Sequence, residues 1–290
     1  MANMSALARF LGAYHRSGLR GSTRITDFLS HKLVSLQEVP VEVDGGTLIA
    51  DLRIASARGI LANPQSQSGE DQVMYQLVRP GDTVFDIGAH LGFYTLLLAK
   101  LTGPRGRVIG FEPNPELLPS LKRTMGRAEN VEIREMALSD SHGVMDLFVP
   151  EDPSMASLSN WTNGRAGHVH TVQCEMAPLD ELIENGRLPV PHFVKCDVEG
   201  AELAVFRGAR KILDKADAPV ILFELNTWAA SSFGNRLSDY SEFLGSLVNA
   251  KYRFFEIDKA GLTELRSTEL DYANVLAVPE HRYSDIEVLA

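Results

Sequence analysis

Val84-Phe85-Asp86-Ile87-Gly88-Ala89-His90-Leu91-Gly92-Phe93-Tyr94-Thr95 is the stretch that decides the fold of this chain. An apolar run ends in Asp86, turns on two glycines and enters a segment with helical character. About one helix further on, a second apolar run, Val108 to Phe111, ends in Glu112. A strand, a glycine turn, a helix and a strand that ends in an acid form the nucleoside pocket of a doubly wound sheet.

The spacing of the turn indicates which nucleoside this pocket holds. The glycines are spaced Gly88-x-x-x-Gly92, whereas a dinucleotide-binding turn needs Gly-x-Gly-x-x-Gly. Asp86 at the strand tip would repel a pyrophosphate, but its carboxylate suits an ammonium or a sulfonium group. The pattern therefore favours S-adenosylmethionine as the cofactor. An NAD-dependent oxidoreductase on the same fold class is the alternative, and a glycine turn without a ligand is a further one.

The length and composition of the chain fit one large α/β domain with a short extra segment. The chain has 290 residues, of which 44% are hydrophobic, so it can bury a full core. Its apolar runs fall short of the roughly 18 residues of a membrane span, and its start lacks the pattern of a secretion signal. Two cysteines are too few for a disulfide framework or a zinc site. We therefore expect a cytoplasmic protein.

The charge of the chain is unevenly distributed. A net charge of −10 argues against the alternative of a nucleic-acid methyltransferase, because such binding relies on neutralising phosphates. Residues 1–35, however, carry five Arg and Lys side chains and a single acid, Asp27. Within this segment Leu7, Phe10, Leu11 and Tyr14 share one face of a helix. We interpret it as a leader helix that packs on the domain, with peripheral membrane contact or docking to a partner as alternatives.

The pattern along the chain predicts an N-terminal extension over 1–66 and a main domain over 67–290. Residues 39–62 resemble a strand pair with its turn at Asp44–Gly46. In the main domain seven strands alternate with helices, which predicts an α/β, Rossmann-like doubly wound sheet. The expected strands are 83–87, 107–112, 131–137, 193–197, 220–225, 252–257 and 273–278. Helices are expected near 70–79, 91–102, 201–215 and 239–250, and another begins after the cap Asn114-Pro115.

Residues 141–180 interrupt this alternation. The stretches Gly143 to Pro150 and His168 to Met176 alternate like antiparallel strands, and a polar loop from Ser157 to Gly167 joins them. The pattern predicts a β-hairpin insertion beside the mouth of the expected site. Such inserted loops often serve as lids, although a hairpin without a function is the alternative.

The candidate catalytic residues lie where the fourth core strand ends, in the stretch Lys195-Cys196-Asp197-Val198-Glu199-Gly200-Ala201-Glu202. Lys195, Asp197 and Glu199 share one face by strand periodicity. A carboxylate there can steady a cationic methyl donor or take a proton from an attacking hydroxyl. We expect Asp197 to be the base, with Glu199 second, and Lys195 to orient the substrate or pair with these acids. The alternative is that Glu199 and Glu202 only stabilise the start of the next helix.

The next strand adds Glu224 and Asn226 at its end. Together with Asp197 these residues offer three oxygen ligands that could hold Mg²⁺, so a magnesium ion is a candidate second cofactor. Cys196 lies beside Asp197 in the sequence but points to the other face, and a buried structural role is expected for it.

With these motifs assembled, the chain resembles the FkbM-type family of S-adenosylmethionine-dependent methyltransferases over roughly residues 68–280. The resemblance rests on the Asp86 to Thr95 turn, on Gly110 to Asn114, on Ala137 to Asp140 and on Lys195 to Glu202. It implies O-methylation of a hydroxyl on a sugar, a polysaccharide or another natural product.

The resemblance also implies roles for particular residues. By position, Asp86, Gly88 and Gly92 should hold the methionine end of the cofactor, Glu112 the ribose, and the segment from Ala137 the adenine. His90, Phe93, Tyr94 and Asn114 belong to the same motifs and complete the candidate cofactor-binding set. His90 stands where Asn is common in such turns, which leaves its backbone as the expected contact.

Overall fold

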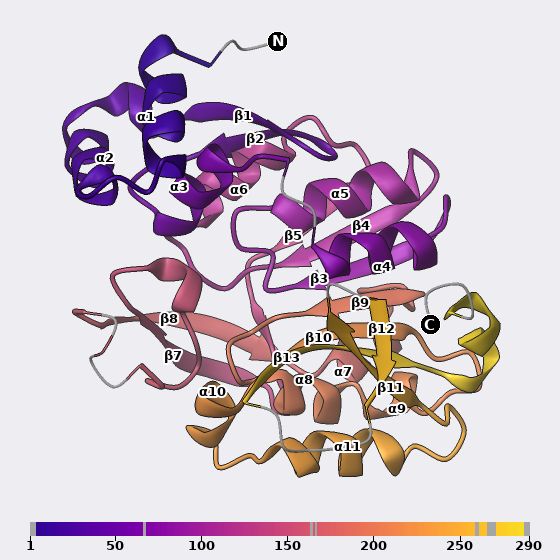
Figure 1. Ribbon diagram of the computed structural model, residues 1–290. Helices are drawn as coiled ribbons and strands as arrows, with labels where there is room; N and C mark the ends of the chain where they lie inside the picture. Colours follow the sequence, from indigo (N-terminus) through magenta and orange to yellow (C-terminus); the bar gives the residue numbers. More distant parts are fainter. Residues whose placement is uncertain are drawn as a thin grey trace.

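A computed structural model describes residues 4–65, 68–162, 165, 167–258, 261–265 and 271–286 of the chain. Its centre is an eight-stranded sheet in the order β12-β11-β13-β10-β9-β3-β4-β5 (Figure 1). The strands are β3 (Thr83–Ile87), β4 (Arg107–Phe111), β5 (Val131–Arg134), β9 (Phe193–Cys196), β10 (Val220–Asn226), β11 (Arg253–Asp258), β12 (Gly261–Glu264) and β13 (Tyr272–Val278).

The direction and order of the strands confirm the predicted doubly wound fold. β5, β4, β3, β9 and β10 are parallel, whereas β13 runs antiparallel to both β10 and β11. The strand order reverses next to β3, because β4 lies on one side of it and β9, from much later in the chain, on the other. Ligands bind at such a switch point, outside the carboxyl ends of the strands. All seven expected strands are present, and β12 adds an eighth at the edge.

Helices cover both faces of this sheet, and the alternation of side chains along each strand explains why. Val84, Val108 and Leu222 pack against α4 (Gly69–Leu77) and α5 (Phe93–Thr102). Phe85, Ile109 and Ile221 point to the opposite face, against a second group of helices. This group comprises α7 (Leu179–Glu184), α8 (Glu202–Gly208), α9 (Arg210–Leu213) and α11 (Leu237–Gly245). Strands covered on both faces are therefore apolar throughout, as the sequence indicated.

Several helix boundaries differ from the sequence expectations. Asn114 does not begin a helix, because its side chain accepts a hydrogen bond from the amide of Glu116 in an intervening turn, and α6 spans Leu118–Met125. The single helix expected over 201–215 is divided into α8 and α9 at Ala209. α10 (Thr227–Ser231) follows β10 directly, and the described part of the chain ends in the 3-10 helix η3 (Glu280–Ile286).

The N-terminal extension contains α1 (Ala6–Arg16), α2 (Ser22–Lys32), the 3-10 helix η1 (Val34–Leu36), β1 (Val39–Val43), β2 (Gly46–Ala50) and α3 (Ala55–Ala62). The expected strand pair over 39–62 is present but ends at Ala50. The prediction was wrong for the remaining residues, because an alanine-rich segment there forms α3. Residues of α1, β1, β2 and α3 share one hydrophobic core with Leu121 and Met125 of α6. The expected boundary between residues 66 and 67 lies outside the described residues.

The face that α1 buries differs from the one the sequence predicted. Ala8, Leu11 and Gly12 face the interior, and Gly12 packs closely on Leu61 of α3. Leu7 and Phe10 are instead exposed to solvent. The small residues Ala8 and Gly12 allow α1 to approach α3 closely. This close packing decides which face of α1 is buried, although the exposed face carries larger apolar side chains.

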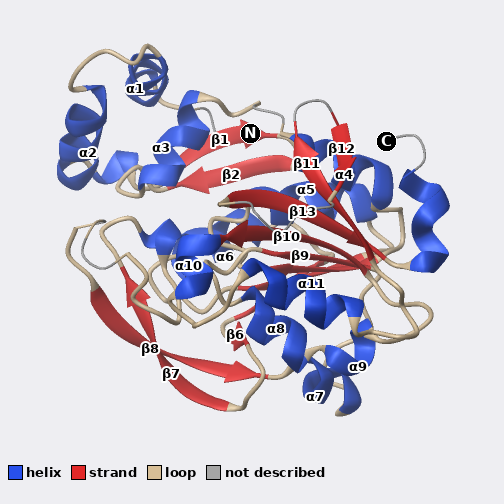
Figure 2. Ribbon diagram, turned by 60° about the horizontal axis from the view of Figure 1, so that its bottom comes forward, coloured by secondary structure: helices blue, strands red, loops and turns tan. Residues whose placement is uncertain are grey.

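The insertion forms a separate three-stranded sheet below the central one (Figure 2). β7 (Gly143–Val149) and β8 (His170–Ala177) pair antiparallel, which confirms the predicted hairpin, and β6 (Ala137–Leu138) joins β8 in parallel. The loop between them includes the 3-10 helix η2 (Pro153–Met155), while residues 163, 164 and 166 lie outside the described part. Ser157 donates a hydrogen bond to the carbonyl of Glu199 at 2.8 Å, so this loop is fixed to the end of β9.

Among the described residues, no helix is both long enough and apolar enough to cross a membrane.

Candidate active site

Two adjoining cavities lie at the carboxyl ends of the parallel strands. The first, which we call the β4 cavity, lies between the ends of β3 and β4, the start of β6 and the insertion loop from Pro153 to Leu158. The second, which we call the α3 cavity, has a volume of about 520 Å³ and reaches α3, α4, the start of α5 and the ends of β9 and β10. The two cavities share Gly88, His90, Ser154, Asp197 and Glu199.

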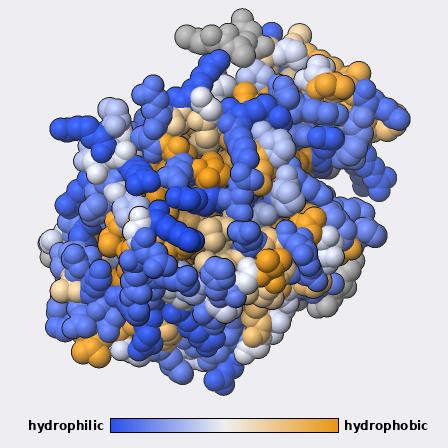
Figure 3. All heavy atoms as spheres, turned by 180° about the vertical axis from the view of Figure 1, so that it is seen from behind, coloured by the Kyte–Doolittle hydropathy of each residue, from blue (hydrophilic) through white to orange (hydrophobic). Residues whose placement is uncertain are grey.

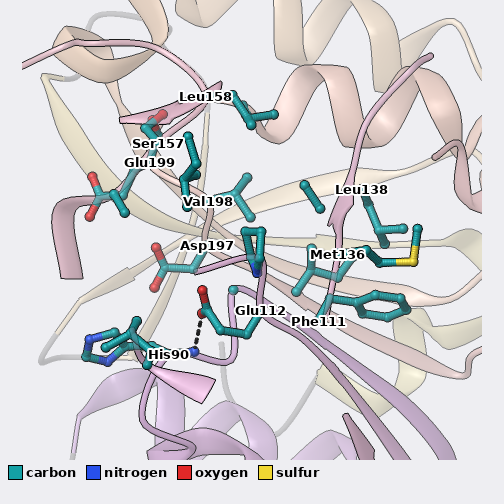
Figure 4. A pocket seen from close by; sticks show the side chains of 18 of the residues that line it. His90, Phe111, Glu112, Met136, Leu138, Ser157, Leu158, Asp197, Val198 and Glu199 are labelled. Atoms are coloured by element: carbon teal, nitrogen blue, oxygen red, sulfur yellow. Dashed lines mark hydrogen bonds between the residues drawn. The ribbon is translucent and has the colours of Figure 1, made fainter. Parts of the chain in front are cut away.

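The β4 cavity has an apolar side and an acidic side. Phe111, Met136 and Leu138 lie on one side of it, and the carboxyl groups of Glu112 and Asp197 lie on the other (Figure 4). An aromatic base needs apolar walls, and a ribose needs hydrogen-bond acceptors beside them. The cavity therefore has the composition that a nucleoside requires, and its volume of about 70 Å³ holds part of one.

Glu112 is held rigidly at the start of this acidic side. Its two carboxylate oxygens accept hydrogen bonds from the backbone amides of His90 and Asn114, each at 2.8 Å. Burial raises the pKa of Glu112 to about 7, although these two amide donors act in the opposite direction. Each oxygen keeps a second lone pair, so the carboxylate can still accept hydrogen bonds from a ligand.

His90 adopts a left-handed backbone conformation, with φ at 52°. Asn tolerates this region better than most residues, which explains physically why an Asn is common at this place in the turn. Burial lowers the pKa of the His90 imidazole to about 4, so the ring is neutral at physiological pH. Its Nε2 lies 3.3 Å from the hydroxyl of Ser56, and this contact joins α3 of the extension to the turn.

Asp86 is buried at the tip of β3 with one carboxylate oxygen unsatisfied. Oδ2 accepts a hydrogen bond from the Thr95 hydroxyl at 2.6 Å, whereas Oδ1 has no partner among the described residues. Burial raises the pKa of Asp86, and the nearby Lys195 opposes this effect. A buried acceptor without a donor is costly, and the ammonium group of S-adenosylmethionine is a suitable donor. The residues of this turn therefore fit the cofactor that the sequence indicates.

Lys195 is the central cation of the α3 cavity. Its side chain is 4% exposed, its ammonium donates to Asp197 at 3.1 Å, and it lies 4.7 Å from the centre of the Tyr94 ring. Burial is the largest single effect on the pKa of Lys195 and lowers it, but the combined attraction of Asp197, Asp86 and Glu70 raises this pKa above its ordinary value. The expectation that Lys195 pairs with the acids at this strand end is thus met by Asp197.

Acids outnumber cations around this lysine. One carboxylate oxygen from each of Asp197, Glu199 and Glu224 lies within 4.8 Å of the other two. Burial and repulsion by neighbouring carboxylates raise the pKa of Glu199 to about 9 and that of Glu224 to about 8. Three such oxygens fit a hard cation such as Mg²⁺ and equally fit a sulfonium. The magnesium ion stays a prediction, with Glu199 in place of Asn226 as its third ligand.

Two polar residues of this region have structural roles. Asn226 caps α10, because its side-chain oxygen accepts a hydrogen bond from the amide of Ala229 at 3.2 Å. Glu202 accepts hydrogen bonds from the amides of Val198 and Gly200 at 3.0 and 3.1 Å. It thereby supports the turn in which Glu199 has a φ of 52°. Glu202 therefore has a structural role at the start of α8, which is the alternative that the sequence left open for it. Glu199 instead lines both cavities.

The remaining candidate residues are divided between the two cavities and the protein interior. Gly88 lies between the cavities, and Ala137 lines the β4 cavity. Phe93 and Tyr94 line the α3 cavity and not the expected cofactor side. Gly92 begins α5 and faces Leu121 and Met125 of α6. Asn114 is buried behind Glu112, and neither it nor Gly92 lines either of the two cavities.

The sequence did not single out Glu70, which lies at the start of α4. Its carboxylate accepts a hydrogen bond from the Tyr94 hydroxyl at 3.0 Å, and burial raises its pKa. The Ser68 and Asp71 capping box marks the start of this helix and is the signal that could have placed Glu70 near the site.

Comparison with known proteins shows the family to which this chain belongs. The model of the Methyltransferase FkbM domain matches residues 86–254, which is more than half of the chain. The chain belongs to the FkbM methyltransferase family. The match begins at Asp86 and includes the cofactor turn, Glu112, the insertion and the Lys195–Asp197 pair.

Three curated proteins named as methyltransferases are similar to about half of this chain. A hexuronic acid methyltransferase, AglP, of Haloferax volcanii is 28% identical over 53% of this chain and 62% of its own. A 2-O-methyltransferase, NoeI, of Sinorhizobium fredii is 26% identical over 55% of this chain and 70% of its own. The 31-O-demethyl-FK506 methyltransferase FkbM of Streptomyces tacrolimicus is 35% identical over 50% of this chain and 64% of its own. The match therefore leaves about a third of these proteins uncovered.

Proposed function

We propose that this FkbM-family protein transfers the methyl group of S-adenosylmethionine to a hydroxyl of a sugar or a related natural product. The observation that carries the proposal is that Asp197 lines both cavities at the point where they meet. A donor in the β4 cavity and an acceptor in the α3 cavity would meet at this carboxylate. The O-methylating relatives support the class of reaction.

The donor would lie along the β4 cavity, with its adenine between the apolar walls and its ribose on Glu112. Its methionine part would extend past Gly88 into the α3 cavity, where its ammonium would pair with the free oxygen of Asp86. This orientation directs the sulfonium toward Asp197 and Glu199, which the two cavities share. The gathered carboxyl groups stabilise the positive sulfur and hold the methyl group at the boundary with the α3 cavity.

The acceptor hydroxyl would attack the methyl carbon in line with the bond to sulfur. The carbon–sulfur bond breaks as the carbon–oxygen bond forms, and the hydroxyl proton passes to a carboxylate. S-adenosylhomocysteine and an ether are the products. Positioning of the two reactants can supply roughly 7–11 kcal/mol of the rate enhancement, and a base adds about 10²–10⁴-fold.

The charges of the site favour Asp197 over Glu199 as the base. With a pKa of about 9, Glu199 is protonated at neutral pH and is a poor proton acceptor before the donor binds. Asp197 is paired with Lys195, and its side chain is 35% exposed toward the cavities. Asp197 therefore offers a carboxylate, while Lys195 fixes its orientation.

The α3 cavity indicates the kind of acceptor. Asp71, Asp86, Asp197, Glu199 and Glu224 line it, and Lys195 is its one lining Lys or Arg among the described residues. Because this lysine is already paired with Asp197, the site offers no free Lys or Arg among its described lining residues to an acidic sugar, so we propose a neutral or amino sugar hydroxyl. The hexuronic acid named for the Haloferax relative would fit poorly.

Incubation of the protein with candidate acceptors and a trideuteromethyl donor, followed by mass spectrometry, tests this function. A product that has gained one trideuteromethyl group in place of a hydrogen, on a neutral or amino sugar, supports the proposal. Label on uronic acids alone would overturn the acceptor class, and label on nitrogen or carbon alone would overturn O-methylation. The same assay after treatment with EDTA, with and without added Mg²⁺, tests the magnesium prediction.

A further inference from the structure

The helical hairpin of the N-terminal extension exposes an unusual number of apolar side chains. Seven of the fourteen large apolar side chains that are exposed in the described chain lie between Met4 and Leu36. They are Leu7, Phe10, Leu19, Ile25, Phe28, Leu33 and Val34. Phe10 is 64% and Phe28 is 62% exposed, far more than a side chain that serves the core. We call these residues and the basic side chains among them the hairpin surface.

The exposed apolar residues follow the geometry of the two helices. Leu7, Phe10 and Tyr14 form one stripe on α1, and the rings of Phe10 and Tyr14 stack at 6.1 Å. Ile25, Phe28 and Lys32 have the same spacing on α2, with the Lys32 ammonium 5.9 Å from the Phe28 ring. In Figure 3 apolar side chains gather at the upper right, in the region of α1. Patches of this kind mark sites of interaction with a partner or a membrane.

The same segment is positive on an otherwise acidic protein. Arg9, Arg16, Arg20, Arg24 and Lys32 are exposed, and none of them forms an ion pair with another described residue. The single acid of the segment, Asp27, is paired with Arg58 of α3 at 3.0 Å. The chain as a whole carries −10, so five free cations here contrast with the rest of its surface.

We propose that the hairpin surface docks the protein on an anionic lipid bilayer. Short amphipathic helices with Phe and Leu beside Arg and Lys lie in the interface of such a membrane, where the apolar side chains enter and the cations meet lipid phosphates. The turn between α1 and α2 adds Leu19 and Arg20, so the tip of the hairpin has the same composition as its sides. An acidic protein surface would satisfy the cations but would leave two exposed phenylalanines without an apolar partner.

Sedimentation of the full chain with vesicles tests this proposal. We expect the protein to sediment with vesicles of phosphatidylglycerol and phosphatidylcholine, much less with phosphatidylcholine alone, and less as salt is added. The double variant Arg20→Gln/Arg24→Gln should weaken binding about thirtyfold, from the usual effect of each cation near a charged membrane. Phe10→Ser/Phe28→Ser should weaken it by at least tenfold, since both side chains are already exposed in the folded protein.

Matched variants elsewhere on the surface serve as controls. Arg105→Gln/Arg207→Gln removes two exposed cations, and Val144→Ser/Val248→Ser removes two exposed apolar side chains, all outside the hairpin. These variants should bind the vesicles as the unchanged protein does. Absence of sedimentation with anionic vesicles would overturn the proposal, and so would equal losses in the control variants. A molar mass that falls only in the hairpin variants, without vesicle binding, would instead assign the surface to self-association.

Discussion

Gly88 and Asp197 are in direct contact across the ends of β3 and β9. A Cβ atom on Gly88 would overlap the carbonyl oxygen of Asp197, and the amide of Asp197 donates to the carbonyl of Ile87 at 2.9 Å. Gly88 also has a φ of 88°, which disfavours any other residue. The glycine of the cofactor turn thus fixes the position of the proposed base, and the two motifs of the sequence form one unit.

Substitution of Gly88 should destabilise the protein more than its backbone angle alone requires. Gly81 is the matched control, because its φ is 94° but a Cβ there would meet no atom within 4 Å. Gly81→Ala should lower the free energy of unfolding by about 1–2 kcal/mol from backbone strain. Gly88→Ala should cost about 1–3 kcal/mol more, from steric overlap. Urea unfolding measures the free energy of unfolding of both variants. Equal losses of this free energy would show that Gly88 is not needed for the approach of the strands.

Removal of the Glu112 carboxylate should weaken binding of the cofactor. Hydrogen bonds to a charged group contribute about 1.5–3 kcal/mol, so Glu112→Ala should raise the Kd for S-adenosylmethionine by roughly one to two orders of magnitude. Calorimetry measures this change, and Glu116→Ala, an exposed acid on the same loop, is the control. An unchanged Kd would remove Glu112 from the ribose site.

Replacement of Asp197 should separate catalysis from cofactor binding. Asp197→Asn preserves the size of the side chain but removes the proton acceptor, so turnover should fall by about 10²–10⁴-fold with little change in the Kd for S-adenosylhomocysteine. Turnover is measured with the acceptor that the labelling experiment identifies. Asp146→Asn, on the exposed face of β7, should leave turnover unchanged. Near-normal turnover of Asp197→Asn would assign Asp197 a structural role.

The sequence predicted the parts of this site that lie within continuous motifs. The Asp86 to Thr95 turn and the Lys195 to Glu202 stretch each carry their strand end and their polar side chains together, so periodicity was enough to place them. Glu70 could not be found in this way, because its contact with Tyr94 depends on how α4 packs across the sheet. For the same reason the sequence could not show that Phe93 and Tyr94 line the α3 cavity and not the expected cofactor side.

The helical stripe of α1 shows a second limit of the sequence. Leu7 and Phe10 have the spacing of a buried face, but Gly12 lets α3 approach on the other side, and shape decides which face packs. Likewise Asn226 follows a core strand as a metal ligand would, yet the helix that begins beside it uses its oxygen as a cap. Competing local partners of this kind are visible only in three dimensions.

Loss of the Lys195 charge should be strongly destabilising. The lysine is buried, and Lys195→Met would leave Asp197 and the buried Asp86 without their cation. Breaking a buried pair in this way costs about 3–5 kcal/mol of the free energy of unfolding. Lys122→Met, which removes an exposed partner of Glu135, should change stability little. Denaturant unfolding compares the two, and similar small losses would show that the cluster does not depend on Lys195.

Because Glu199 is protonated in the free protein, the affinity for S-adenosylmethionine relative to S-adenosylhomocysteine should depend on pH. At pH 7 the pKa values of about 9 and about 8 leave Glu199 and Glu224 mainly protonated in the free protein. The positive sulfonium of S-adenosylmethionine favours the ionised forms, whereas the neutral sulfur of S-adenosylhomocysteine does not. Donor binding should therefore release protons, and by linkage the donor should gain affinity relative to the product as pH rises.

Between pH 7 and pH 9 we expect the ratio of the two Kd values, product over donor, to increase by about ten- to a hundredfold, since one proton released per donor bound sets a limit of tenfold for each of the two pH units. Glu199→Gln should flatten this rise, and Glu242→Gln, an exposed acid on α11, should not. Stability gives an independent check of the sign. Because the folded protein binds more protons than the unfolded chain between the ordinary glutamate pKa and about 9, its free energy of unfolding should fall as pH rises through this range. A ratio of Kd values that stays constant with pH would place the sulfonium away from Glu199.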